Sequence, residues 1–286
     1  ASTRIEGASL SDAEVDRLMR GISMRKLVDR SEQEVRGYFE LLQTLLEAWM
    51  TVLLTESSIQ HLHKEMLKYV EKDAWHRGKY KQLDNAVTAT GPDGSSVVVF
   101  ATTSPYLTPK AMEELVPWTQ RALLEAKYHP LLVIGSAMVE FLAIHPFQDG
   151  NGRLSRLLTN LLLLRAGYAY VPYVSHEKLI EGDKRSYYIA LRSAQKTFAT
   201  KRETIVPWLT YFLRVLEQQA EQAIALLSRT SIEQQLSEKQ LAILHCVEQT
   251  REASTSTITA ALKIARPTVV QALAKLLRLK LIDRIG

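Results

Sequence analysis

The sequence predicts a mainly α-helical protein that carries one β-hairpin and ends in a winged helix-turn-helix domain. Two long apolar runs, at residues 131–144 and 157–164, contain few helix breakers and are typical of buried helices. The segment 74–100 differs, because glycine, aspartate and asparagine surround two short β-branched runs there, which favours a hairpin. From Ser237 onward, three helical patterns follow one another at helix-turn-helix spacing.

Composition and charge place the chain among ordinary globular proteins. Its 286 residues are long for one domain, and 46% are hydrophobic and 23% charged. The net charge is +5, which favours an anionic partner without identifying it. Most of this surplus lies in residues 236–286, where eight Lys and Arg face four Asp and Glu. A single cysteine, Cys246, excludes a disulfide framework and fits a cytoplasmic setting. The apolar run at 131–144 is too short to span a bilayer, and no signal peptide opens the chain.

Helical periodicity predicts the remaining elements in chain order. The expected helices cover residues 30–54, 59–70, 109–126, 131–144, 175–195, 205–227, 237–249, 255–262 and 266–280. A further helix is expected to open at Gly150–Gly152 and to include the apolar run 157–164. Ser256 and Thr257 are expected to cap the second helix of the C-terminal module, and Pro267 to lie in the first turn of the third. A strand is expected to begin at Leu281. His61 and His63 are two residues apart and point to different helix faces, so no metal site is expected there.

The stretch Ala143–Arg156, AIHPFQDGNGRLSR, concentrates most of the chargeable chemistry between the two buried helices. Pro146 disfavours the α conformation at His145, so the first helix should end with this imidazole at its C-terminus. Histidine titrates nearest neutrality, which makes His145 the candidate general base. Phe147 is expected to anchor the loop in the core.

The second half of the stretch has the residues of a phosphate site. Asp149 is a hard oxygen ligand suited to Mg²⁺, and Gly150–Gly152 allows positive φ and offers N–H groups at a helix N-terminus. Arg153 and Arg156 lie three apart on one helix face, where an anion between them would offset the unfavourable macrodipole. The stretch therefore predicts a polyphosphate cradle beside a base. A plain polar loop would explain the glycines, but not the histidine, aspartate and two arginines together.

These residues resemble the signature of the Fic family, His-Pro-Phe-x-Asp-Gly-Asn-Gly-Arg-x-x-Arg, which is complete here from His145 to Arg156. The resemblance implies a protein adenylyltransferase that moves AMP from ATP to a Ser, Thr or Tyr hydroxyl of a target protein. His145 would be the base, Asp149 would hold Mg²⁺, and Leu62-His63 would match a structural pair of the family. The ATP-binding residues that it implies are Phe147, Gly150, Asn151, Gly152, Arg153, Arg156, Tyr187, Tyr188 and Gln195.

The N-terminal segment Ser2–Gly7 has the form Ser-x-x-x-Glu-Gly. By itself it is typical of a solvated chain terminus. Some members of the Fic family carry such a motif as an inhibitory helix, which implies that Glu6 pairs with Arg156 and that Ser2 belongs to the same helix. The resemblance would then make the catalytic site autoinhibited. A chain that starts so abruptly is also expected to be the remainder of a longer one.

Two further parts of the resemblance concern recognition. The hairpin would be the flap that pairs with the target segment, with Phe100, Ala101, Thr102 and Thr103 as docking residues; an ordinary edge hairpin is the alternative. The family commonly has a proline-rich stretch where this chain has Thr102–Pro105. The C-terminal module resembles winged-helix domains that follow Fic domains. Arg266, Thr268 and Gln271 are the candidate DNA contacts, and protein contact or dimerisation is the alternative.

The expected domain organisation follows from these assignments. Residues 1–30 would form the inhibitory helix and a connector, 31–215 the Fic catalytic domain, 216–236 a helical linker, and 237–286 the winged-helix domain. Two other functions stay open. One is a bifunctional enzyme that also removes AMP, and the other is a DNA-binding regulator with a nucleotide-sensing core. A homodimer is compatible with either of them.

Overall fold

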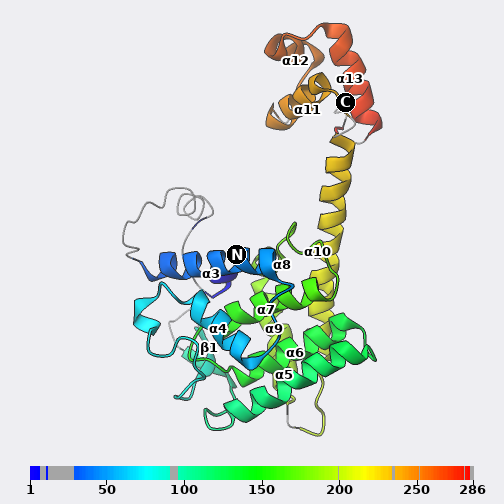
Figure 1. The fold of residues 1–286 in the computed structure, drawn as a ribbon. Helices are drawn as coiled ribbons and strands as arrows, with labels where there is room; N and C mark the ends of the chain where they lie inside the picture. Colours follow the sequence, from blue (N-terminus) through cyan, green and yellow to red (C-terminus); the bar gives the residue numbers. More distant parts are fainter. Residues whose placement is uncertain are drawn as a thin grey trace. The chain divides into compact units, whose positions relative to one another are not determined.

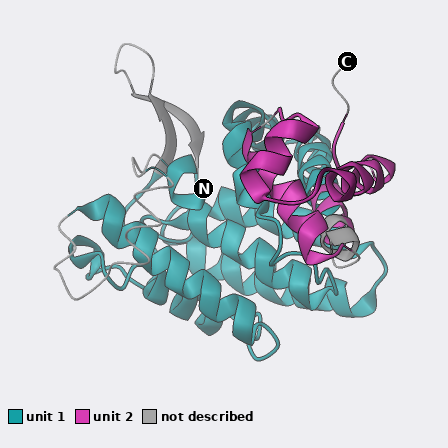
Figure 2. Ribbon diagram, turned by 90° about the horizontal axis from the view of Figure 1, so that it is seen from above, with its two compact units in different colours: residues 1–220 teal, residues 221–286 magenta. Residues whose placement is uncertain are grey.

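The structure is a computed structural model that describes residues 1–6, 11, 29–90, 96–198, 200–233, 236–250, 252–279 and 281–283. It is mainly helical, as predicted, and divides into two compact units, residues 1–220 and 221–286 (Figure 2). Among the described residues, no helix combines the length and the apolar character that a membrane crossing requires.

The two helices predicted to be buried lie at the centre of the first unit (Figure 1). In α6 (Pro130–Ile144) ten residues are buried, and in α7 (Asn151–Arg165) all but two are, so α7 is covered on nearly every side and α6 over most of its surface. The helices packed around this pair are α3 (Arg30–Ala48), α4 (Glu56–Met66), α5 (Thr108–Glu125), α8 (His176–Gly182), α9 (Lys184–Gln195) and the first part of α10 (Val206–Glu233). A loop between α6 and α7 is therefore held at both ends by the core.

Short N-terminal elements complete the first unit. The helix α1 (Ser2–Ile5) contacts α3, α7 and α8, and its Ile5 is buried in the main core. A 3-10 turn, η1 (Glu71–Asp73), follows α4. Gly7 and most of the connector that was expected before α3 lie outside the described residues.

Two predicted helices are shorter than expected, because local hydrogen bonds end them. The helix predicted for residues 30–54 ends at Ala48, whose carbonyl accepts from the backbone N–H and the hydroxyl of Thr51. Thr55 then caps α4 by accepting from the Ser58 amide, 3.1 Å away. The last turn of the predicted helix at 59–70 is also absent, since α4 ends at Met66.

The prediction of a single helix over residues 175–195 was wrong. It is split into α8 and α9 at Asp183, whose backbone leaves the helical region at φ −139°. The Asp183 carboxylate accepts from the Ser186 amide at 3.1 Å and caps α9. The helix α10, by contrast, is longer than predicted, because it continues to Glu233 and the predicted end was Leu227.

The hairpin segment contains two strands, β1 (Ala86–Thr90) and β2 (Ser96–Ala101). They pair antiparallel with Ala86 opposite Ala101, and the register shifts between Val87 and Thr88, as in a β-bulge. The turn residues 91–95 lie outside the described part of the chain.

The C-terminal unit contains α11 (Glu238–Thr250), α12 (Thr255–Leu262) and α13 (Arg266–Arg278), close to the predicted bounds. Its core contains Leu236, Ile243, Leu244, Ile258, Val269, Ala272 and Leu276. The cap of α12 is Ser254, which accepts from the Thr257 amide, so the prediction of Ser256 and Thr257 was wrong. Pro267 starts α13 as predicted. The expected strand is absent from residues 281–283, and residues 284–286 are not described.

The three residues predicted to contact DNA lie near the start of α13. Arg266 and Gln271 are exposed, and Thr268 is partly buried.

Candidate active site

His145 ends α6, and it leaves the right-handed α region as Pro146 predicted, although it adopts the left-handed region at φ 53° and ψ 59° and not an extended conformation. Its amide donates to the Phe141 carbonyl at 2.9 Å, and its Nδ1 lies 3.2 Å from the Leu142 carbonyl oxygen. A carbonyl can only accept, so Nδ1 carries the proton and Nε2 of the neutral ring can receive one. Burial lowers the pKa of His145, which keeps the ring in this neutral form near pH 7.

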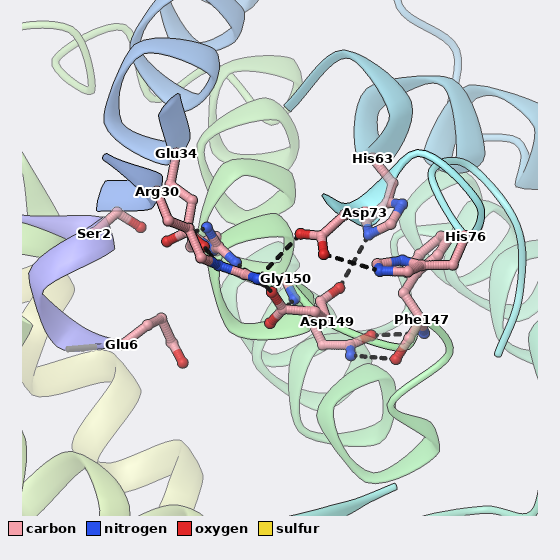
Figure 3. Close-up of polar contacts among 12 residues, drawn as sticks. Ser2, Glu6, Arg30, Glu34, His63, Asp73, His76, Phe147, Asp149 and Gly150 are labelled. Carbon is pink, nitrogen blue, oxygen red and sulfur yellow. Dashed lines mark hydrogen bonds and ion pairs between the residues drawn. The ribbon is translucent and has the colours of Figure 1, made fainter. Parts of the chain in front are cut away.

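The loop after His145 is fixed by Phe147 and by a histidine from α4. Phe147 is fully buried, as predicted, and its ring stacks on His63 with 3.9 Å between centroids. The Gly78 amide donates to Nδ1 of His63, so Nε2–H faces the Asp149 carbonyl oxygen, 3.0 Å away (Figure 3). Burial lowers the pKa of His63 to about 4, so the ring stays neutral. His63 therefore supports the loop, which is the structural role that the resemblance implied.

The turn into α7 depends on Gly150 and Asn151. Gly150 has φ +78°, and a Cβ added there would lie 2.7 Å from the Met66 methyl group. The Asn151 side chain is buried and makes two hydrogen bonds with the backbone of Phe147, at 2.9 and 2.7 Å. Asn151 thus closes the loop through both polar atoms of its side-chain amide.

Asp149, the predicted magnesium ligand, contacts two arginines, of which Arg30 is labelled in Figure 3. Its Oδ2 is 2.8 Å from Arg30 Nη2 and 3.1 Å from Arg153 Nη2, and its Oδ1 accepts from the Gly150 amide. Burial opposes ionisation, but Arg153, the amide and Arg30 together lower the pKa of Asp149 below its ordinary value. Arg30 Nη2 also contacts Asp73 at 3.0 Å.

Arg153 is almost completely buried and has its own internal counter-ion. Its Nη1 lies 2.9 Å from the Glu34 carboxylate, on the first turns of α3. Glu34 is also bound by Arg30, four residues earlier, at 2.7 Å. The start of α3 thus brings a cation to Asp149 and an anion to Arg153. Sequence reasoning missed both residues; the only available signal was their i, i+4 spacing, which is common on helix surfaces.

Arg156 is 2% exposed and is held by the N-terminal helix α1. Its Nε donates to the Ser2 hydroxyl at 2.8 Å, and its Nη2 donates to the Ser2 carbonyl at 2.9 Å and to Glu6 Oε1 at 2.8 Å. A Cβ on Gly152 would lie 2.2 Å from the same Glu6 oxygen, so this close approach requires glycine. Burial acts to lower the pKa of Arg156, but Glu6, Tyr187, Tyr38 and Glu177 together raise it above its ordinary value.

The three residues outside the loop that were predicted to bind ATP, Tyr187, Tyr188 and Gln195, differ in their burial. Tyr187 is buried among Trp208 and Tyr211, with ring centroids 5.8 and 6.0 Å away, so it belongs to the core beside α10. Tyr188 is 40% exposed, and its hydroxyl donates to the Ile5 carbonyl of α1 at 3.4 Å. Gln195 is buried at the end of α9.

The predicted docking residues follow or end strand β2. Phe100 and Ala101 are its last two residues, and their side chains lie outside the described part of the structure. The Thr103 amide donates to the Ala143 carbonyl at 3.3 Å, and Thr102 bonds through its hydroxyl to Asn85. The end of this strand is therefore attached to the last turn of α6, and through Asn85 to the Phe147 carbonyl of the loop that follows.

Behind Arg156 lies His176, a buried histidine whose ring nitrogens have no hydrogen-bond partner among the described residues. Burial lowers its pKa to about 4, whereas the unfolded chain takes up a proton near 6.5. As the pH falls below 6.5, the unfolded state binds a proton that the folded state does not take up until about pH 4. The free energy of unfolding is therefore unaffected by His176 above pH 6.5 and decreases as the pH falls toward 4.

We expect this loss to reach on the order of 3 kcal/mol in unfolding free energy, and His176→Leu to remove it. Urea unfolding between pH 7 and 4 measures the effect. His61→Leu, at an exposed position on α4, is the control and should keep the wild-type pH dependence. An identical pH dependence for His176→Leu and wild type would contradict the assignment.

The site has one carboxylate that fits a magnesium ion, Asp149. Among the described residues there is no group of three or more His, Cys, Asp or Glu side chains that could hold a metal. Mg²⁺ commonly binds proteins through one or two carboxylates, with waters and substrate phosphates completing the shell. Asp149 is 42% exposed and held ionised, so its chemistry fits a metal that arrives with a polyphosphate.

The fold and the loop together define a class of helical proteins in which a loop rich in charged and glycine residues connects two core helices. A model of the Fic/DOC family matches residues 53–163, which contain α4 to α6, the loop and most of α7. A Fido domain-containing protein of Dictyostelium discoideum is 33% identical over 111 residues, which are 37% of this chain and 73% of that protein. The chain belongs to the Fic/DOC family.

Two further relatives extend the comparison. A protein adenylyltransferase Fic of Aedes aegypti is 56% identical over 41 residues, which cover 14% of this chain and only 8% of that protein. The crystal structure of a Fic domain-containing signaling protein from Bacteroides thetaiotaomicron is similar with a TM-score of 0.60 at 26% identity, over 78% of this chain and 84% of that one. The mainly helical Fic fold is thereby confirmed.

Proposed function

We propose that the protein transfers AMP from ATP to a hydroxyl side chain of a target protein and releases pyrophosphate. The observation that carries the proposal is the segment from His145 to Arg156, which combines a histidine whose Nε2 can accept a proton with two buried arginines in the first turns of α7. The adenylyltransferase activity named for the Aedes relative agrees with it.

In this proposal His145 Nε2 takes the proton of the acceptor hydroxyl as its oxygen attacks the α-phosphorus. The new oxygen–phosphorus bond forms as the bond from the α-phosphorus to the bridging oxygen of pyrophosphate breaks. Arg153 and the N–H groups at the start of α7 stabilise the charge on the phosphates, and Arg156 binds the γ-phosphate. Because Arg156 fixes the γ end, the α-phosphorus is the atom presented to the acceptor. Asp149 would hold a Mg²⁺ ion, which supplies charge neutralisation on the phosphates.

The contact between Glu6 and Arg156 gives the proposed enzyme an inhibited state. A γ-phosphate needs the Arg156 guanidinium, and Ser2 and Glu6 occupy three of its hydrogen bonds. Glu6 also approaches Gly152 more closely than a Cβ would allow, so it takes the space at the N-terminus of α7. ATP would then bind productively only when α1 moves away.

The test uses ATP labelled at the α- or the γ-phosphate, incubated with cell lysate and either the wild-type protein or Glu6→Gly. The proposal predicts covalent label from α-labelled ATP only, and more of it with Glu6→Gly. Label from γ-labelled ATP would indicate phosphate transfer instead. No label in any arm would overturn the proposal.

Glu6 also favours a second candidate, a bifunctional enzyme that removes AMP as well. Its carboxylate is 34% exposed beside the phosphate site, where it could orient a water molecule. Release of AMP from a modified target by wild type, and its loss in Glu6→Ala, would establish removal. Equal release by both proteins would exclude Glu6 from it.

Arg30 should compete with Mg²⁺ for Asp149. We expect Arg30→Gln to lower the Mg²⁺ concentration for half-maximal transfer by about 1.4- to 5-fold, because a partly exposed ion pair contributes about 0.2–1 kcal/mol. A magnesium titration in the Glu6→Gly background measures this. Arg36→Gln is the control, since Arg36 pairs with Glu40 away from Asp149. An unchanged midpoint in Arg30→Gln would show that the Arg30 contact does not limit metal binding.

A further inference from the structure

Lys81 is a buried lysine that the proposed mechanism does not yet use. Only 3% of its surface is exposed, and its Nζ donates to three neutral oxygens. These are the Ile144 carbonyl at 3.0 Å, the Asn85 amide oxygen at 2.8 Å and the Thr102 hydroxyl at 2.8 Å. Asp84 favours the charged form from a longer range, but each of these three bonds goes to a neutral oxygen. Burying an ammonium group in this way is costly, so a lysine that merely fills space would not be expected here.

The contacts of Lys81 lie on both sides of His145. Its side chain holds the carbonyl of the preceding residue, Ile144, and its backbone amide donates to the carbonyl of the following residue, Pro146, at 2.8 Å. Asn85, itself bound to Lys81, donates to the Phe147 carbonyl at 2.8 Å. Three backbone carbonyls around the catalytic histidine are therefore fixed by this one segment.

The same network includes the base of the hairpin. Asn85 directly precedes β1 and Thr102 directly follows β2, so Lys81 bridges the two ends of the hairpin. Thr102 also lies 2.8 Å from the Asn85 carbonyl and 2.6 Å from its amide oxygen, and its single proton can go to either. A displacement of the hairpin base would thus be transmitted through Lys81 to the loop that carries His145.

We propose that Lys81 is the positioning residue of the active site, which orients the His145 backbone from both sides and couples it to the base of the hairpin. The inference rests on the proposed function, because it gives His145 the role of base. It explains why the carbonyls next to His145 keep their places although His145 itself adopts a left-handed conformation.

The charge of Lys81 has a second effect. Burial lowers the pKa of Lys81 to about 8, so the group is still mainly protonated at pH 7. The pKa of His145 is lowered first by burial and also by this cation, whereas the Leu142 carbonyl, Glu6 and Asp149 act in the opposite direction. Lys81 thus favours the neutral ring that a general base requires.

The first test measures the titration of His145 by NMR in the wild type, Lys81→Met and Lys81→Arg, with the signal identified by its loss in His145→Ala. We expect the His145 midpoint to rise in Lys81→Met and to stay near the wild-type value in Lys81→Arg. Lys79→Met, two residues away and exposed, is the control and should leave the midpoint unchanged. An unchanged midpoint in Lys81→Met would overturn the electrostatic role.

The second test measures AMP transfer in the Glu6→Gly background. Lys81→Met should lower kcat by about 10- to 100-fold with KM for ATP within about twofold, since small displacements of a catalytic group have effects of this size. The acid limb of the pH profile should move to higher pH. Equal kcat and an unmoved pH profile would overturn the proposal. If Lys81→Met does not fold, Lys81→Gln, which keeps an amide donor, serves in both tests.

The two tests separate this inference from the proposed function. The NMR titration needs no turnover, so a raised His145 midpoint would support Lys81 even if no variant transferred AMP. The absence of AMP transfer in every variant would instead reject the AMP-transfer proposal.

Discussion

His145→Ala is expected to reduce AMP transfer by at least about 10²- to 10⁴-fold, the usual contribution of a general acid or base. The reason is geometric. Nδ1 donates to the Leu142 carbonyl, so Nε2 is the only ring nitrogen that can take the hydroxyl proton. The backbone that shapes the loop is fixed by Lys81, Asn85 and Asn151, which the substitution leaves in place.

ATP binding should survive in His145→Ala, because the phosphate-binding arginines belong to α7. Label incorporation from α-labelled ATP measures the transfer, and isothermal titration in the Glu6→Gly background measures ATP binding, which should change by no more than about twofold. His61→Ala, at an exposed position, should retain full activity. Unchanged incorporation by His145→Ala would show that another group is the base.

Glu6→Gly is expected to raise auto-modification by roughly tenfold or more. Hydrogen bonds to a charged group contribute about 1.5–3 kcal/mol, and about 1.4 kcal/mol corresponds to a factor of ten. The substitution removes the carboxylate from Arg156 and from the space above Gly152. Both effects open the position that the γ-phosphate needs.

A matched series makes the second prediction sharper. Glu6→Gln keeps the size and one acceptor but loses the charge, so its rate should fall between those of wild type and Glu6→Gly. Ser2→Ala removes only the hydroxyl that accepts from Arg156 Nε and should have the smallest effect. Equal rates for all four proteins would remove the inhibitory role of α1.

The catalytic loop was predictable from the sequence, because its chemistry is local. Pro146 predicted that α6 would end at His145, and Gly150 predicted the positive φ before α7; both are found. The pairing of Glu6 with Arg156 joins residues 150 apart in sequence, and only the resemblance to a known family could indicate it. No periodicity in the N-terminal segment carries that information.

Other parts of the site depend on packing that a sequence pattern does not contain. Arg30 and Glu34 look like an ordinary helical ion pair, and their second partners, Asp149 and Arg153, come from a distant loop. Lys81 looks like a surface lysine in a polar segment, yet it is buried beneath the loop. Asp183 ended a helix whose apolar pattern continued across it, because a side-chain cap competes with the helix.

The most direct test of the central claim is the stoichiometry of the reaction on purified Glu6→Gly protein. Covalent label from α-labelled ATP and released pyrophosphate are measured together over time. The proposed mechanism predicts one pyrophosphate for each AMP attached. It predicts neither product for the double variant that carries both Glu6→Gly and His145→Ala. Release of ADP with retention of the γ-phosphate, or AMP attachment that survives His145→Ala, would contradict it.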